Sequence, residues 1–122
     1  MKRVLDVGQC GMDHASIRGL LERNFDVEVA AAHSHEDALR ALADGEFALV
    51  LVNRKMDADY SDGMEIVKSI KADAKLAATP VMLVTNYAEH QQAAVAAGAE
   101  PGFGKAQLNH PATIETLRKF LA

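Results

Sequence analysis

Residues 47–52, FALVLV, form an unbroken apolar run that ends at Asn53. A strand with one face in solvent alternates apolar and polar residues, so a continuous apolar run predicts a strand that is covered on both faces. Sheets covered on both faces are typically parallel, with helices as the connections. Further strands are expected at Arg3–Val7, Asp26–Ala31, Pro80–Thr85 and Pro101–Lys105.

Each expected strand is followed by a helical pattern, so the chain reads as five strand–helix units. The expected helix starts are Asp13, Ser34 with Asp37, Asp62 with Glu65, Asn86 with Glu89, and Pro111. Right-handed crossovers then favour an α/β fold, a doubly wound, flavodoxin-like three-layer sandwich with the parallel strand order 2-1-3-4-5. At 122 residues, one domain spanning 1–122 is expected.

Charge and cysteine content narrow the function classes. The net charge is -4 and the Lys and Arg residues are scattered, which argues against nucleic-acid or anionic-membrane binding. The only cysteine, Cys10, has no internal partner for a disulfide, as is usual in a reducing cytoplasm. No apolar run is long enough to span a bilayer, so we expect a complete cytoplasmic chain.

In a sheet of this order, ligands bind outside the carboxyl ends of the strands. The residues expected there are Gly8, Gln9 and Cys10 after the first strand, Asn53 after the third, Thr85 and Asn86 after the fourth, and Lys105 after the fifth.

Four pieces of the sequence resemble the receiver domain of two-component response regulators. They are "ALVLVN", the Asp62-Gly63 pair, "PVMLVTNYAE", and "AGAEPGFGK" leading to Lys105. In receivers the third strand ends in an aspartate that accepts a phosphoryl group, and an acidic pair after the first strand holds magnesium. A Thr or Ser ends the fourth strand and a Lys ends the fifth. The resemblance therefore implies a phosphorelay signalling role.

Compared with that pattern, Thr85 and Lys105 fit, but Asn53 stands at the acceptor position and Gly8 and Gln9 stand at the acidic pair. A carboxylate can attack phosphorus, whereas a neutral amide is a very poor nucleophile and a weak magnesium ligand. We therefore expect a degenerate phosphorylation site with no metal and no cofactor. Lys105 is expected to bond the Asn53 side-chain oxygen or Thr85, preserving the scaffold without its reaction.

Other departures concern the readout of a receiver. The loop "RKMDADYS" is longer than is usual and lacks the familiar proline, and Ala106 stands where receivers usually have a proline. Gly102 occupies the aromatic switch position, with Phe103 one residue later. A cation site built from Asp57, Asp59 and Asp62 is conceivable, but a solvated loop is the favoured interpretation.

The remaining polar residues are assigned structural or surface roles. Asp6, within a central strand, needs a partner or a proton if it is buried. The histidines are expected at the surface: His14, His33, His35, His90 and His110. Cys10 is interpreted as a partly buried thiol rather than a reactive one.

The fourth helix offers small residues at Ala93, Ala94 and Ala97, next to a fifth strand that contains Phe103. The resemblance implies an interaction face there, with a homodimer through helix 4, strand 5 and helix 5. The leading hypothesis is a pseudo-receiver that acts as a phosphorylation-independent interaction module for a signalling protein, and is not an enzyme. Two alternatives remain: a flavin- or cobalamin-like binding domain of the same fold and, less favoured, an enzyme acting through Cys10 or a loop metal.

Overall fold

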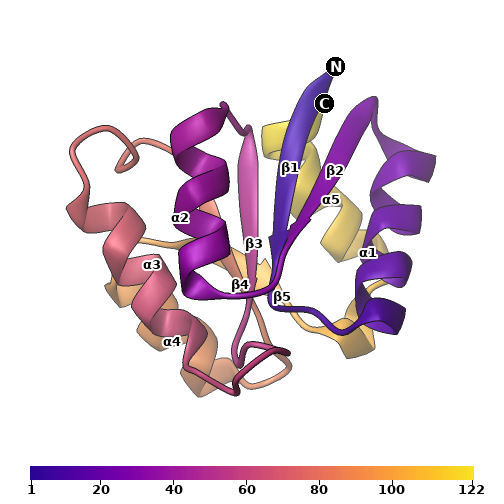
Figure 1. Cartoon of the computed structure of the whole chain (residues 1–122). Coiled ribbons are helices and arrows are strands. Elements are labelled where there is room, and N and C mark those ends of the chain that lie inside the picture. The colour runs from indigo at the N-terminus through magenta and orange to yellow at the C-terminus, as the bar shows by residue number, and fades with distance from the viewer.

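The structure, a computed structural model, describes all 122 residues. Its strands are β1 (Lys2–Val7), β2 (Val27–Ala32), β3 (Leu49–Asn53), β4 (Val81–Val84) and β5 (Glu100–Phe103). Its helices are α1 (Gly11–Asn24), α2 (His35–Asp44), α3 (Gly63–Ala72), α4 (Ala88–Ala96) and α5 (Pro111–Leu121), with a short 3₁₀ helix η1 (Lys105–Gln107). All pairings are parallel and the order is β2-β1-β3-β4-β5 (Figure 1), as predicted.

The helices cover both faces of the sheet, which explains why β3 carries no polar residue before Asn53. Helices α2, α3 and α4 lie on one face, and α1 and α5 lie on the other (Figure 1). In β1, Leu5 and Val7 pack in the core under α2 to α4, whereas Val4 packs in the core under α1 and α5. A side chain at position 6 consequently faces α1 and α5 as well.

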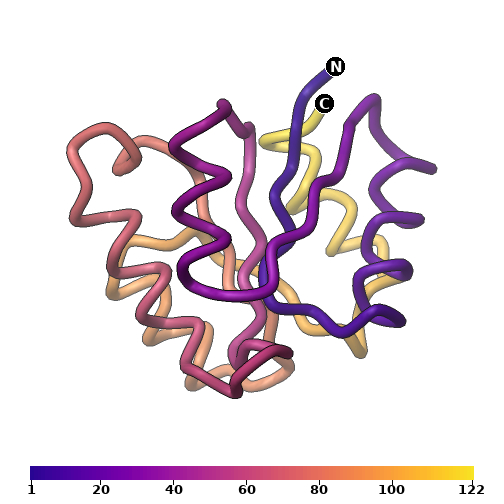
Figure 2. Tube along the Cα trace, viewed as in Figure 1, coloured from indigo at the N-terminus to yellow at the C-terminus, as the bar shows by residue number.

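The two chain ends lie close together in space (Figure 2). Lys2 Nζ donates hydrogen bonds of 3.0 Å to the carbonyl oxygens of Phe120 and Ala122, so β1 is tied to the end of α5. None of the helices combines the length and the apolar character that crossing a bilayer requires.

Three of the five predicted helix starts are confirmed. Ser34 Oγ accepts a hydrogen bond from the Asp37 amide at 3.1 Å, Asp62 Oδ1 accepts from the Met64 amide at 2.9 Å, and Pro111 opens α5. The other two predictions are wrong. Cys10 occupies the N-cap position of α1, with Asp13 inside the first turn, and Tyr87 occupies the N-cap position of α4; neither side chain makes a capping hydrogen bond.

Asn86 does not cap α4, because its side chain closes a different turn. Its Oδ1 accepts a hydrogen bond of 3.0 Å from the Ala106 amide, so it holds the chain that follows β5. This turn starts η1 at Lys105, and β5 therefore ends at Phe103, earlier than the predicted Lys105.

Strand β5 is an edge strand, as its proline and glycines suggested. Its pairing with β4 is irregular between Met82 and Val84. Gln91 of α4 compensates: its Oε1 accepts from the Gly102 amide at 2.9 Å, and its Nε2 donates to the Leu83 carbonyl at 2.8 Å. One side chain thus supplies ladder bonds that the strand pair does not make.

We predict that Leu51→Ala lowers the free energy of unfolding by about 2–5 kcal/mol, because Leu51 is fully buried at the centre of β3 and its truncation leaves a cavity. The matched control is Val95→Ala on α4, where the side chain is 43% exposed and the change is expected to stay within about 0.5 kcal/mol. Urea denaturation measures both. Equal losses in the two variants would contradict the assigned core.

Candidate functional site: the crevice at the carboxyl ends of the strands

Asn53, Thr85 and Lys105 meet at the carboxyl edge of the sheet, as predicted. They line one cavity of about 220 Å³, whose other walls are Arg54, Lys55, Val84, Asn86 and Tyr87. Gly8 and Gln9 follow β1 at the same edge but are buried and do not line this cavity. The crevice therefore lies between β3, β4 and the turn after β5.

The side-chain amide of Asn53 works as a donor. Its Nδ2 donates to the Gly8 carbonyl at 3.2 Å and to the Lys55 carbonyl at 2.8 Å. These bonds tie the end of β1 to the start of the loop after β3. An ionised carboxylate accepts hydrogen bonds and donates none, so an aspartate at this position would make neither bond.

Met56, in the loop that follows β3, fills the space beside Gly8. The Met56 side chain is fully buried. A Cβ atom added to Gly8 would lie 2.5 Å from Met56 Cε and 2.7 Å from Met56 Sδ, which is closer than carbon and sulfur atoms pack. Gly8 also has φ +80°, a conformation that other residues rarely adopt. An acidic side chain at position 8 would therefore force the Met56 side chain to move and would strain the backbone.

The loop 54–62 is held in place by backbone hydrogen bonds. The Asp57 amide donates to the Gly8 carbonyl at 3.0 Å, and the Met56 amide donates to the Ser61 carbonyl at 2.9 Å. Lys55 and Asp62 form an antiparallel bridge, which closes the loop at its base.

The three loop carboxylates do not converge. Asp59 Oδ1 accepts from the Ser61 hydroxyl at 2.6 Å and from its amide at 3.0 Å, and these bonds hold the pKa of Asp59 below its usual range. Asp62 caps α3, and Asp57 is exposed. The structure contains no group of three or more His, Cys, Asp or Glu side chains arranged to hold a metal ion.

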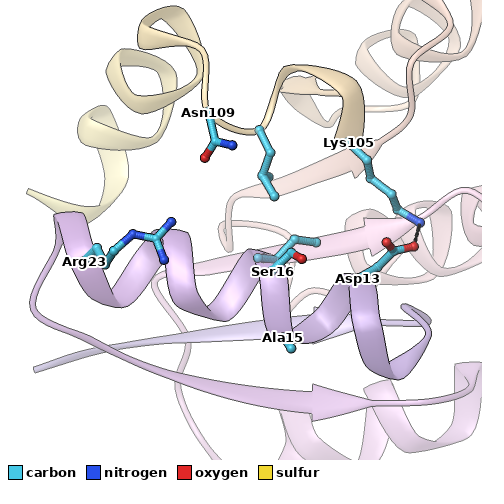
Figure 3. A pocket seen from close by; sticks show the side chains of 8 residues that line it. Asp13, Ala15, Ser16, Arg23, Lys105 and Asn109 are labelled. Atoms are coloured by element: carbon cyan, nitrogen blue, oxygen red, sulfur yellow. Dashed lines mark hydrogen bonds and ion pairs between the residues drawn. The ribbon is translucent and has the colours of Figure 1, made fainter.

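Lys105 does not bond Asn53 or Thr85, and that prediction is wrong. Its Nζ lies 2.8 Å from Asp13 Oδ2, in the first turn of α1 (Figure 3). A carboxylate attracts an ammonium more strongly than a neutral amide or hydroxyl does. The hydrogen bond from Lys105 also holds the pKa of Asp13 below its usual value.

Behind this ion pair, α1 and the segment after β5 border a second hollow of about 390 Å³ (Figure 3). Ser16, Arg23 and Asn109 are among its lining residues. Lys105 lines both this hollow and the crevice beside Asn53. Its ion pair with Asp13 therefore lies between the two spaces.

Thr85 is buried and engaged on the α4 side of the crevice. Its Oγ1 lies 3.3 Å from His90 Nδ1 and accepts a hydrogen bond of 3.3 Å from the Tyr87 amide. The Thr85 hydroxyl thereby holds the turn between β4 and α4.

The buried Asp6 pairs with the half-buried His14, a contact that the sequence interpretation missed. Asp6 is 1% exposed, and its Oδ2 lies 2.7 Å from His14 Nδ1. Burial raises the pKa of Asp6 to about 6. Asp6 Oδ1 and the side-chain amide of Gln9 are buried without partners. The sequence did carry one indication of this pair. Asp6 lies on the face of the sheet that α1 covers, and His14 lies in the first turn of α1.

The remaining histidines divide between surface and structural positions. His33 and His110 are exposed as predicted, whereas His35 is half-buried and its Nε2 lies 3.0 Å from Ser69 Oγ. His110 Nδ1 accepts from the Ala112 amide at 3.2 Å and caps α5. Cys10 is half-buried at the start of α1 and forms no disulfide.

Two residues of the face that was expected for interaction are buried and cannot contact a partner. Ala94 and Phe103 are 0% and 4% exposed and belong to the core. Ala93 is exposed and Ala97 is half-buried, so these two residues remain accessible on α4 and at its end.

We predict that Asp6→Asn changes how stability depends on pH. Because the pKa of Asp6 is about 6 in the folded protein against an ordinary 3.8, the folded state binds the proton more tightly, and its stability falls as pH rises from about 4 to above 6. Relative to Asp6→Asn, the wild-type free energy of unfolding should fall across this window by up to about 3 kcal/mol. Denaturant titrations at several pH values measure it. Exposed Asp44→Asn is the control, and a parallel curve for Asp6→Asn would contradict the buried-acid assignment.

Comparison with known proteins agrees with this architecture. The family model of the response regulator receiver domain matches residues 13–119. The crystal structure of the signal receiver domain of a DNA-binding response regulator protein from Colwellia psychrerythraea 34H is 24% identical with a TM-score of 0.82, covering 98% of this chain and 97% of that one. The chemotaxis protein CheY4 of Vibrio cholerae is 25% identical with a TM-score of 0.73, covering 98% and 94%.

A sensor protein from Polaromonas sp. JS666 is similar in fold, with a TM-score of 0.83 at 17% identity, and covers 98% of this chain and 94% of its own. These matches do not favour the flavin- or cobalamin-like alternative. Receiver domains are signalling modules and not enzymes. The family model covers most of the chain and the sheet order is that of the matched structures, so the chain belongs to the response regulator receiver domain family.

Proposed function

We propose that this chain is a pseudo-receiver of a two-component system, a module that signals through protein contacts without accepting a phosphoryl group. The observation that carries the proposal is the packing of Met56 beside Gly8. In a phosphorylated receiver this region holds a magnesium ion on an acidic pair. Here an acidic side chain at position 8 would have to displace the buried Met56 side chain and adopt a backbone conformation that residues other than glycine rarely adopt.

The chemistry of Asn53 supports the same proposal. Its amide nitrogen is a poor nucleophile and is occupied as a donor to the carbonyls of Gly8 and Lys55. The cavity beside it is lined by Arg54, Lys55 and Lys105 and by no Asp or Glu. Such walls repel a divalent cation, and magnesium at phosphoryl-transfer sites is usually held by carboxylates.

The partner surface that we propose is the exposed part of α4 and the neighbouring edge of β5. Val95 is 43% exposed, and with Ala96, Pro101, Gln91 and Gln92 it lines a shallow, mostly apolar hollow of about 460 Å³. An apolar hollow at a sheet edge fits a protein surface. A signalling protein or a second copy of this chain, pairing through α4, β5 and α5, would occupy it.

We predict that the wild-type protein gains no phosphoryl group when it is incubated with magnesium and a small phosphodonor such as acetyl phosphate. The physical reason is the absence of a carboxylate nucleophile and of carboxylate ligands for magnesium at the crevice. Intact-mass spectrometry of the denatured protein measures a covalent adduct directly. A stoichiometric adduct that maps to the crevice would refute the proposed function.

Asn53→Asp is the informative variant for the same assay. If the nucleophile alone were missing, this change would restore phosphorylation. We expect no magnesium-dependent adduct, because Met56 still fills the space beside Gly8 and no acidic pair is restored. A competent receiver domain treated in parallel shows that the phosphodonor is active.

A further inference from the structure

Strand β2 forms one edge of the sheet (Figure 1). It pairs with β1 in a regular parallel register over its whole length. At one end of this pairing the Lys2 amide donates to the Asp26 carbonyl at 3.3 Å. At the other end the Gly8 amide donates to the Ala32 carbonyl at 2.8 Å. Because the backbone groups of a strand point to alternate sides, the even-numbered residues of this segment face β1.

The odd-numbered residues Val27, Val29 and Ala31 therefore direct their N–H and carbonyl groups away from the sheet. None of the backbone hydrogen bonds formed by turns and loops reaches these groups. Ala31 is exposed and Val29 is half-buried, so the row is accessible to a neighbour. An open row of donors and acceptors along a regular edge is a template for another strand.

The other edge of the sheet is protected, whereas β2 is not. Strand β5 contains Pro101, and its pairing with β4 is irregular. The Gln91 side chain accepts from the Gly102 amide and so occupies a backbone donor of that strand. Proline, irregular pairing and covered backbone groups are common protections of an edge. Strand β2 has no proline, glycine, lysine or bulge, and its one charged residue, Glu28, already pairs with Arg3 at 3.8 Å.

We propose that β2 pairs antiparallel with β2 of a second copy of this chain, about a two-fold axis at Val29, so that two sheets join into one. In this register Val29 lies opposite Val29 of the second copy, and Val27 lies opposite Ala31. Each outward-facing residue then exchanges its N–H and carbonyl with the residue opposite. The pairs are self-complementary, as a symmetric interface requires.

Charge selects this register among those that two copies could form. An axis at Val29 places Glu28 opposite Ala30 of the second copy. An axis at Glu28 would place the two Glu28 side chains opposite each other, and an axis at Val27 would place Glu28 opposite Asp26. Directly opposed like charges destabilise a strand pair. An axis nearer the end of β2 would pair fewer residues.

The dimer should be weak and should depend on protein concentration. Stable interfaces bury about 1,200–2,000 Å², more than one pair of edge strands supplies. The inference goes beyond the proposed function, because it uses the edge of the sheet opposite to α4 and β5. A dimer through β2 leaves that other surface free for a signalling partner.

The test is amide hydrogen exchange of the wild-type protein, followed by NMR at about 50 µM and at about 1 mM. We expect exchange at Val29 and Ala31 to slow about threefold or more at the higher concentration, because these amides donate only in the dimer. The amides of Glu28 and Ala30 face β1 and should exchange slowly at both concentrations. Sedimentation over the same range should show a monomer–dimer equilibrium.

Ala31→Pro is the informative variant, because it removes an outward-facing N–H and leaves the ladder to β1 intact. It should weaken dimerisation about tenfold, since the symmetric pair loses that donor twice. Ala31→Lys should also weaken the dimer, because lysine on an edge strand opposes pairing. Thermal melting shows whether each variant is folded, and Ala31→Lys decides the matter if Ala31→Pro is not.

Ala93→Lys is the matched control, because it makes the same change at an exposed position of α4 and should leave the dimer unchanged. A mixture of isotope-labelled and unlabelled protein reports the register. We expect a short Hα–Hα contact between Glu28 of one copy and Ala30 of the other. Four results would overturn the proposal: a monomer at about 1 mM, exchange along β2 that is independent of concentration, a dimer without this contact, or equal weakening by Ala93→Lys and Ala31→Lys.

Discussion

The contact between Met56 and Gly8 is the constraint on which the crevice depends. Met56 is fully buried and would have to move if position 8 carried a side chain, and Gly8 adopts a positive φ that suits glycine. The Asn53 amide and the Asp57 amide both donate to the Gly8 carbonyl, so the loop after β3 is fastened to the end of β1. An apolar side chain thereby occupies the space beside Gly8, at the carboxyl ends of β1 and β3.

Two polar side chains near Met56 and Gly8, those of Asp6 and Lys105, pair with residues of α1. Lys105 pairs with Asp13 in the first turn of α1, and Asp6 of β1 pairs with His14 one residue later. Two adjacent residues of one helical turn thus connect α1 to β1 and to the segment after β5. The cost of this arrangement is a carboxylate buried in the sheet, whose raised pKa reflects its desolvation.

Most of the fold was predictable because it follows from local patterns. The continuous apolar run of β3 indicated a sheet covered on both faces, and the side chains of Ser34 and Asp62 marked helix starts correctly. The predictions failed where a polar side chain had a choice of partners. Asn86 bonds the Ala106 amide and does not cap α4, and Lys105 bonds Asp13 and not Asn53 or Thr85. Such choices depend on distances between residues that are far apart in the chain.

The sequence alone determined the class of fold, the strand order and which residues reach the carboxyl edge of the sheet, because strand burial, helix starts and crossover handedness are local or general properties. It also determined the neutral character of Asn53 and Gly8. Tertiary structure decided that Met56 turns inward, that His14 meets Asp6, and that Arg54 and Lys55 remain unpaired at one cavity. These outcomes arise from packing and charge pairing between distant segments, which no pattern along the chain encodes.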